Sequence, residues 1–269
     1  MSGYWGLVET RRSVLVMSGT QARQVLQDVV TNNVTGASED QAVYAAMLTP
    51  QGKFLFDFFI LGRGDDLLLD VDAARVDVLS ARLRMYCLRR DAAISRDDAL
   101  EVTLAWSDQS DAAPPSVPAG TQIVPDPREP GLGWRIYGAS GPGIEAAVRR
   151  DYDRHRIALS VPEAGPDLRE NETYILEAGF ERLNGVDFRK GCYVGQEVTA
   201  RMKHKAQLRK GLVRVEVDGE AEPGIDILAD GKIAGILLSN VDGVGLAHLR
   251  FDRAKEEMQA GETVVRYTA

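Results

Sequence analysis

Short apolar runs separated by turn-forming residues dominate the first half of the chain. Val43–Leu48 and Phe54–Leu61 are two such runs, and the Thr-Pro-Gln-Gly segment at 49–52 joins them, so they predict a β-hairpin. Further strands are expected in the other apolar runs, at 13–17, 67–71, 100–106 and 134–137.

Two segments place their apolar residues at helical spacing instead. They are residues 20–30 and the segment from Val76 to Cys87. Asn32 and Asn33 follow the first helix, where they suit a left-handed turn or, alternatively, an amide that reaches into a pocket. Cys87 falls on the apolar face of the second helix, where a buried structural thiol is expected. Strands mixed with helices indicate an α+β fold.

The composition changes in the middle of the chain and again near its end. Residues 108–130 hold six of the eleven prolines and predict a long loop, and a helix is expected at 144–156. Short strands separated by Asp-Gly turns then predict a small antiparallel barrel or sandwich. We expect two domains, 1–205 and 206–269. The strands expected in the second are 212–217, 225–228, 233–238, 245–249 and 263–267.

The overall charge limits the classes of partner. The chain has 40 Asp and Glu against 32 Lys and Arg, a net charge of −8, which argues against a protein that mainly coats nucleic acid. Five Lys or Arg residues lie between 201 and 210, and they are either a solvated face or an attractor for a polyanionic cofactor tail, RNA or an acidic protein. No secretory signal or apolar run of about 18 residues is present, so we expect a cytoplasmic protein and no membrane partner.

Residues 190–197 read Lys-Gly-Cys-Tyr-Val-Gly-Gln-Glu, a mixture that no packing rule requires. Arg189 and Lys190 precede Cys192, and a short helix is expected from Gly195, so nearby cations and a helix start favour the thiolate. A thiolate attacks an electrophile, binds a metal or is oxidised. The alternative is a buried cysteine in a tight loop. The chain has only two cysteines, too few to hold an iron–sulfur cluster alone, so any such cluster is shared or belongs to a partner.

Asp57 interrupts an otherwise apolar strand. A carboxylate within a strand usually lies on the solvent face. Here both neighbours, Phe56 and Phe58, are large and apolar, so a buried functional acid is the alternative.

The segment Lys190–Glu197 resembles the hallmark of the YgfZ/CAF17 family, relatives of the glycine-cleavage T-protein, an aminomethyltransferase. The resemblance covers nearly the whole chain. Val43–Lys53 resembles the family's first hairpin, Arg156–Pro162 its Arg-Ile-x-x-Gly-x-Pro segment, and Gly245–Ala247 part of its barrel. It implies a T-protein-like folate-binding region of two intertwined subdomains around a central cavity, followed by a small C-terminal antiparallel β-barrel.

The resemblance also implies tetrahydrofolate, or a one-carbon derivative of it, as the cofactor. Its pterin would lie deep in the cavity, and Cys192 and Lys190 would be the catalytic residues. The implied function is that of an accessory protein for assembly or repair of iron–sulfur clusters in client enzymes, including tRNA-modifying enzymes. Its partners would be those clients or other assembly proteins. The residues expected to bind the cofactor are Asn33, Asp57, Arg156, Tyr193, Gln196, Glu197 and Arg201.

Two other functions stay open. One is an aminomethyltransferase or demethylase that passes a one-carbon unit to tetrahydrofolate. Phe56 stands where that branch has the first residue of an Asp-Asp pair, and Ala158 stands where it has a glutamate. Both differences argue against glycine-cleavage chemistry, because a lost carboxylate is a lost hydrogen-bond acceptor for the folate ring. The other is a binding module whose basic run at 201–210 docks RNA or an acidic protein.

Overall fold

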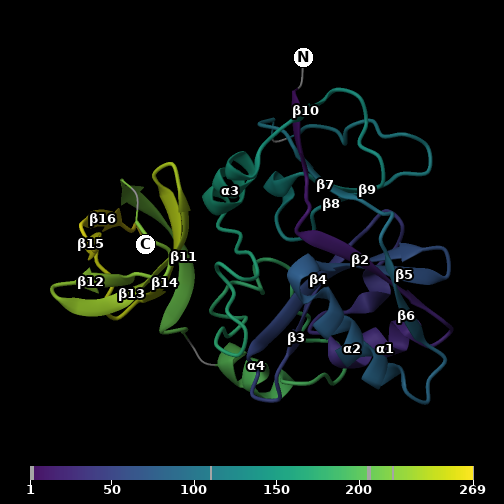
Figure 1. Cartoon of the computed structure of the whole chain (residues 1–269). Coiled ribbons are helices and arrows are strands. Elements are labelled where there is room, and N and C mark those ends of the chain that lie inside the picture. The colour runs from purple at the N-terminus through teal and green to yellow at the C-terminus, as the bar shows by residue number, and fades with distance from the viewer. Residues whose placement is uncertain (1–2, 110, 205–206, 220, 269) are drawn as a thin grey trace.

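The computed structural model describes residues 3–109, 111–204, 207–219 and 221–268. Two five-stranded sheets, four α-helices and a closed barrel account for most of this described part. Figure 1 shows the barrel beside the two sheets, with α3 and an irregular segment between them. The mixed α+β architecture with a separate C-terminal antiparallel barrel confirms the fold class predicted from the sequence.

The β4 sheet is the middle layer of the larger region. Its strands pair in an antiparallel manner, in the order β3 (Val43–Leu48), β4 (Phe54–Arg63), β5 (Asp66–Asp72), β2 (Arg12–Ser18) and β6 (Ala93–Asp97). Helices α1 (Ala22–Val29) and α2 (Val76–Cys87) pack their apolar residues on one face of this sheet.

The β7 sheet covers the opposite face. Apolar side chains from both sheets, such as Tyr44 and Trp106, form one core between them. Because both faces of the β4 sheet are covered, β4 is buried over nine consecutive residues, and apart from Asp57 its buried part is apolar without alternation. The strands of the β7 sheet lie in the order β10 (Ile144–Ala146), β1 (Tyr4–Val8), β7 (Val102–Trp106), β9 (Trp134–Tyr137) and β8 (Gln122–Pro125).

The barrel is joined to this region by α3 (Arg149–Ala158), an irregular segment and α4 (Gln196–Lys203). Ile157 of α3 packs against Leu238 and Leu246 of the barrel. The strands of the barrel lie in the order β11 (Lys210–Asp218), β14 (Val244–Arg250), β13 (Lys232–Val241), β12 (Asp226–Ala229), β15 (Glu257–Ala260) and β16 (Thr263–Arg266). The barrel closes because its first strand, β11, pairs both with β14, the next strand in the order, and with β16, the last one. Short 3-10 helices lie at Val34–Gly36, Ala73–Arg75 and Pro130–Leu132.

Several expectations about local structure are wrong. The segment expected to be a helix at 144–156 begins with β10, because Ile144–Ala146 pairs in parallel with β1, and the helix starts only at Arg149. The loop expected at 108–130 contains β8, which pairs with β9. Asn33 has a φ of −80°, so the turn after α1 is not left-handed. The thiol of Cys87 is half-buried at the edge of the core rather than enclosed in it.

Candidate functional site

The loop that carries Cys192 packs closely against the β3–β4 hairpin at two glycines. Gly195 has a φ of +85°, and a Cβ placed there would lie 2.5 Å from the carbonyl oxygen of Thr49. Gly52, in the hairpin turn, has a φ of +73°, and its Cβ would lie 2.9 Å from that of Val198 on α4. Side chains at these two positions are excluded by both strain and space, so the loop and the hairpin meet backbone against backbone.

Lys190 fastens the other end of the loop. Its ammonium donates hydrogen bonds to the backbone carbonyls of Gln27 at 2.7 Å, Asn32 at 3.0 Å and Val30. These carbonyls lie at and just beyond the C-terminal end of α1, the negative pole of that helix. Burial lowers the pKa of Lys190 to about 8. The structure thus gives this residue a structural role in holding the loop.

Cys192 is exposed between these two attachments. The neighbouring Tyr193 packs against the core between the sheets, and burial raises the pKa of its phenol. Arg189 projects into solvent with 97% of its side chain exposed, 3.9 Å from Asp187. The thiol is accessible and sits on a loop whose backbone is held on both sides.

The three predicted residues that follow belong to the first turns of α4. The side-chain oxygen of Gln196 accepts a hydrogen bond from the backbone N–H of Tyr193 at 3.3 Å and so supports the helix start. Glu197 and Arg201 form an exposed ion pair at 2.8 Å, as their spacing of four predicts. In the adjoining basic run Lys203 pairs with Glu181, while Lys205 lies outside the described residues.

Asp57 lies inside the molecule, on the face of β4 turned toward the β7 sheet. One oxygen, Oδ2, accepts a hydrogen bond from the Tyr44 hydroxyl at 2.8 Å. The other, Oδ1, is buried without a hydrogen-bond partner. Burial raises the pKa of this carboxyl, since the charged form loses its hydration. A carboxylate in this condition is a candidate ligand-binding group.

A cavity of about 420 Å³ adjoins Asp57. This is within the range of small-molecule sites in proteins. Arg75 also lines the cavity, and no pattern in the sequence pointed to this residue. The apolar part of the wall comes from β4, α2 and the irregular segment, and consists of Phe54, Leu55, Phe56, Leu79, Ala164 and Leu168.

Two other predicted cofactor residues have partners elsewhere. Asn33 accepts hydrogen bonds from the backbone and hydroxyl of Thr35 and begins the 3-10 helix there. Arg156 is buried and donates to Asp153 at 2.7 Å, to Asp167 at 2.7 Å and to Ser239 of the barrel at 3.0 Å. Arg156 therefore ties α3 to the barrel, and the predicted residues do not form one site.

A buried ionic network between the two sheets was missed entirely at the level of sequence. Asp70 on β5 accepts hydrogen bonds from Arg12 at 2.6 Å and from Arg135 and the Tyr137 hydroxyl at 2.9 Å each. These guanidinium groups hold the pKa of the Asp70 carboxyl below its ordinary value despite burial. The guanidinium of Arg135 also lies 3.8 Å from the centre of the Phe59 ring.

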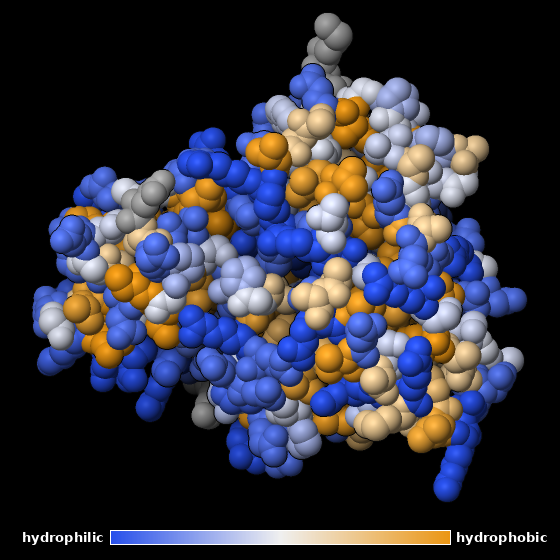
Figure 2. Space-filling view, viewed as in Figure 1, coloured by the Kyte–Doolittle hydropathy of each residue, from blue (hydrophilic) through white to orange (hydrophobic). Residues whose placement is uncertain are grey.

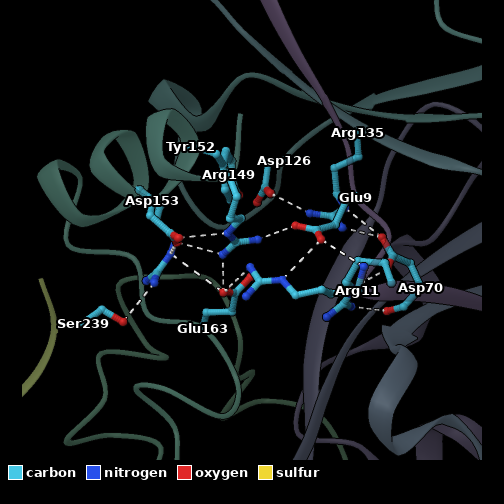
Figure 3. Close-up of polar contacts among 12 residues, drawn as sticks. Glu9, Arg11, Asp70, Asp126, Arg135, Arg149, Tyr152, Asp153, Glu163 and Ser239 are labelled. Atoms are coloured by element: carbon cyan, nitrogen blue, oxygen red, sulfur yellow. Dashed lines mark hydrogen bonds and ion pairs between the residues drawn. The ribbon is translucent and has the colours of Figure 1, made fainter. Parts of the chain in front are cut away.

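The network continues toward the barrel (Figure 3). Arg135 reaches Asp126 at 3.3 Å, and Asp126 pairs with Arg128, which contacts the Tyr152 hydroxyl at 3.2 Å. The guanidinium of Arg149 lies 5.3 Å from the Tyr152 ring and pairs with three carboxylates, those of Glu9, Asp153 and Glu163. Figure 2, which has the same viewpoint as Figure 1, shows hydrophilic side chains gathered around a hollow near the middle of the visible face.

No group of three or more His, Cys, Asp or Glu residues within the described residues is placed to hold a metal ion. No helix in the described part of the chain is long and apolar enough to cross a membrane.

Comparisons with known proteins show relatives across the chain. A family model described as the CAF17 C-terminal beta-barrel domain matches residues 209–269. The mouse protein named iron–sulfur cluster assembly factor IBA57, mitochondrial, is 31% identical over 278 residues, which cover 91% of this chain and 77% of the mouse protein. The human protein of the same name is 30% identical, with the same two coverages of 91% and 77%.

The fold is also found in a solved structure. The aminomethyltransferase T of the glycine cleavage system from Bartonella henselae superposes with a TM-score of 0.79. The superposition covers 98% of this chain and 84% of that one, at 12% sequence identity. This likeness shows a T-protein-like fold, and at such low identity it shows the fold alone.

Proposed function

Because the chain belongs to the YgfZ/CAF17 family, as its identity to the IBA57 proteins shows, we propose that it serves the assembly or repair of iron–sulfur clusters in other proteins. The mouse and human relatives are named as iron–sulfur cluster assembly factors. Tetrahydrofolate would be its cofactor, and Cys192 its reactive group. Both relatives are also named as mitochondrial, and the cytoplasmic location expected from the sequence stays a prediction.

The observation that carries the proposal is an exposed thiol on a loop held at both ends. Thiolates are the usual protein ligands of iron–sulfur clusters, and a cluster ordinarily needs four ligands. The second cysteine, Cys87, is half-buried on α2, and no group of three or more metal-ligating side chains occurs in the described residues. Cys192 would therefore give one ligand to a cluster whose other ligands come from a partner, with the cluster as cargo.

A matched pair of cysteine variants tests this role. Cys192→Ser and Cys87→Ser each replace one sulfur by oxygen, and each is expressed in cells that lack the endogenous protein. We expect Cys192→Ser to lose most of the rescued activity of iron–sulfur enzymes, while Cys87→Ser keeps it. Full rescue by Cys192→Ser, at a protein level equal to that of the unaltered chain, would reject the role of this thiol.

The cavity beside Asp57 supports the folate part of the proposal. A pterin is a flat heterocycle that carries N–H donors, and Asp57 presents a buried acceptor oxygen without a partner beside an apolar wall. The residues present therefore fit the ring, and tetrahydrofolate would supply a carrier for a one-carbon unit. Asp57 would accept a ring N–H, and the aromatic residues Phe54 and Phe56 would help exclude water. The other six predicted cofactor residues stay predictions, since their main contacts are within the chain.

The alternatives receive less support. A one-carbon transferase shares only the fold with this chain, and the differences at Phe56 and Ala158 stand against it. For an RNA-docking module, two cations of the basic run, Arg201 and Lys203, are already paired with carboxylates of the chain. Service to tRNA-modifying enzymes would be one branch of the proposed cluster-assembly role.

A further inference from the structure

Two buried side-chain atoms in the described residues have no hydrogen-bond partner, and both belong to residues that line the same cavity. They are Oδ1 of Asp57 and Nε of Arg75. A buried donor or acceptor left unpaired destabilises the folded state, so such atoms are few in folded proteins. An acceptor and a donor left unpaired at one cavity indicate a ligand that satisfies both.

Arg75 is held in place by contacts that leave its Nε–H unused. The terminal Nη1 forms an ion pair with Glu170 of the irregular segment, which also lines the cavity. The guanidinium lies 5.2 Å from the centre of the Phe56 ring. The backbone before it is fixed, because Asp72 caps the short helix that ends at Arg75. A side chain with these restraints holds its buried Nε–H in one direction.

We infer that Arg75 is a ligand-recognition residue: its Nε–H donates to a ring carbonyl oxygen of a flat heterocycle whose ring N–H is accepted by Asp57. The inference rests on the proposed folate cofactor and deepens it, since it identifies the oxo group of the pterin as the second polar contact.

The charges around the cavity favour a neutral carbonyl over an anionic group as the partner of Arg75. Glu170 already offsets the positive charge of Arg75, and Glu172, which also lines the cavity, lies 3.9 Å from the guanidinium of Arg169. Because its charge is already offset, Arg75 gains less from a second carboxylate than an unpaired arginine would, and an uncharged ring carbonyl can still accept its Nε–H. Phe56, Leu79 and Leu168 complete an apolar wall suited to a ring.

The test is an anaerobic calorimetric titration with three probes: tetrahydrofolate, a reduced tetrahydropterin without a tail, and p-aminobenzoylglutamate as the tail alone. The variants are Arg75→Met and Arg75→Lys. The control is Arg82→Met, because Arg82 also lies near the Phe56 ring, at 6.0 Å, without lining the cavity. Melting temperatures establish that every variant is folded.

We expect Arg75→Met to lower the affinity for tetrahydrofolate and for tetrahydropterin alike, by about ten- to a hundredfold. This is the range expected for the loss of a hydrogen bond to a charged group. Arg75→Lys should not restore binding, because a lysine lacks the Nε–H of the planar group. Arg82→Met should bind as the unaltered protein does. If Arg75→Met binds tetrahydropterin as tightly as Arg82→Met does, or if it loses affinity only for the probes that carry the tail, the inference fails while the folate proposal stands. If the unaltered protein binds no pterin, both fail.

Discussion

Two buried aspartates on neighbouring strands of one sheet are treated in opposite ways. Asp70 on β5 receives hydrogen bonds from two arginines and a tyrosine, and these hold the pKa of its carboxyl below the ordinary value. Asp57 on β4 receives one hydrogen bond, from Tyr44, and burial raises the pKa of its carboxyl. Both face the core between the sheets, so burial alone does not distinguish them.

The difference separates a carboxylate that holds the fold from one that is available to a ligand. The partners of Asp70 come from two strands, Arg12 from β2 and both Arg135 and Tyr137 from β9, so these contacts tie the two sheets together. Asp57 keeps an unpartnered oxygen beside a cavity. A buried carboxylate with its full set of partners stabilises the fold, whereas one with an unpartnered oxygen is available to bind a ligand.

The largest expected effect is on the paired carboxylate. Asp70→Asn leaves the guanidinium groups of Arg12 and Arg135 buried with less compensating charge. Breaking a buried ion pair from one side costs about 3–5 kcal/mol. Urea unfolding followed by circular dichroism measures the loss, with the exposed Asp65→Asn as a control. A loss below about 1 kcal/mol would mean that the network does not hold the sheets together.

Asp57→Asn should change stability less, and with the opposite dependence on pH. The folded-state pKa of Asp57 is raised above 3.8, so its carboxyl favours folding below pH 3.8, and this contribution is lost as pH rises through the raised pKa. Above that window Asp57→Asn should be as stable as the unaltered chain, or more so. Asp70 has a lowered pKa, so its contribution is present above pH 3.8 and is lost as pH falls through the folded-state pKa.

Unfolding free energies of both variants, measured from pH 3 upward, compare the two carboxylates directly. The advantage of the unaltered chain over Asp70→Asn should shrink in acid. Relative to the unaltered chain, the unfolding free energy of Asp57→Asn should increase as pH rises. Curves that move in the same direction would show that the two sites do not differ as described.

The smallest effect is expected at the surface of α4. Arg201→Ala removes an ion pair with Glu197 in which both side chains are mostly exposed. Such pairs are worth about 0.5 kcal/mol or less, and salt screens them. Thermal unfolding at low and high salt measures this. A larger loss of stability that persists at high salt would mean that Arg201 contributes to the fold by more than a screened surface ion pair.

Much of the fold could be predicted because the apolar pattern reports burial. The long run at Phe54–Leu61 predicted β4, and helical spacing predicted α1 and α2. β6 (Ala93–Asp97) was missed because it is an edge strand with mostly exposed side chains. β10 was missed because its pairing with β1 joins residues far apart in the chain.

The site could be predicted only in part. The unusual residues at 190–197 pointed to Cys192, and its exposure agrees with an accessible thiol. The contacts of Lys190 could not be foreseen, since its acceptors lie about 160 residues earlier in the chain. Arg75 gave no signal at all. Arg75 stands out only because its buried Nε lacks a hydrogen-bond partner, and this can be seen only in the folded structure.

The central claim is that the cavity beside Asp57 is built to hold a ligand rather than the fold, and a titration of tetrahydrofolate into the unaltered chain and Asp57→Asn tests it most directly. We predict saturable binding at one site in the unaltered chain and at least about tenfold weaker binding in Asp57→Asn, the loss expected for one charged hydrogen bond, with no fall in melting temperature. Equal affinity in the two proteins would contradict the account.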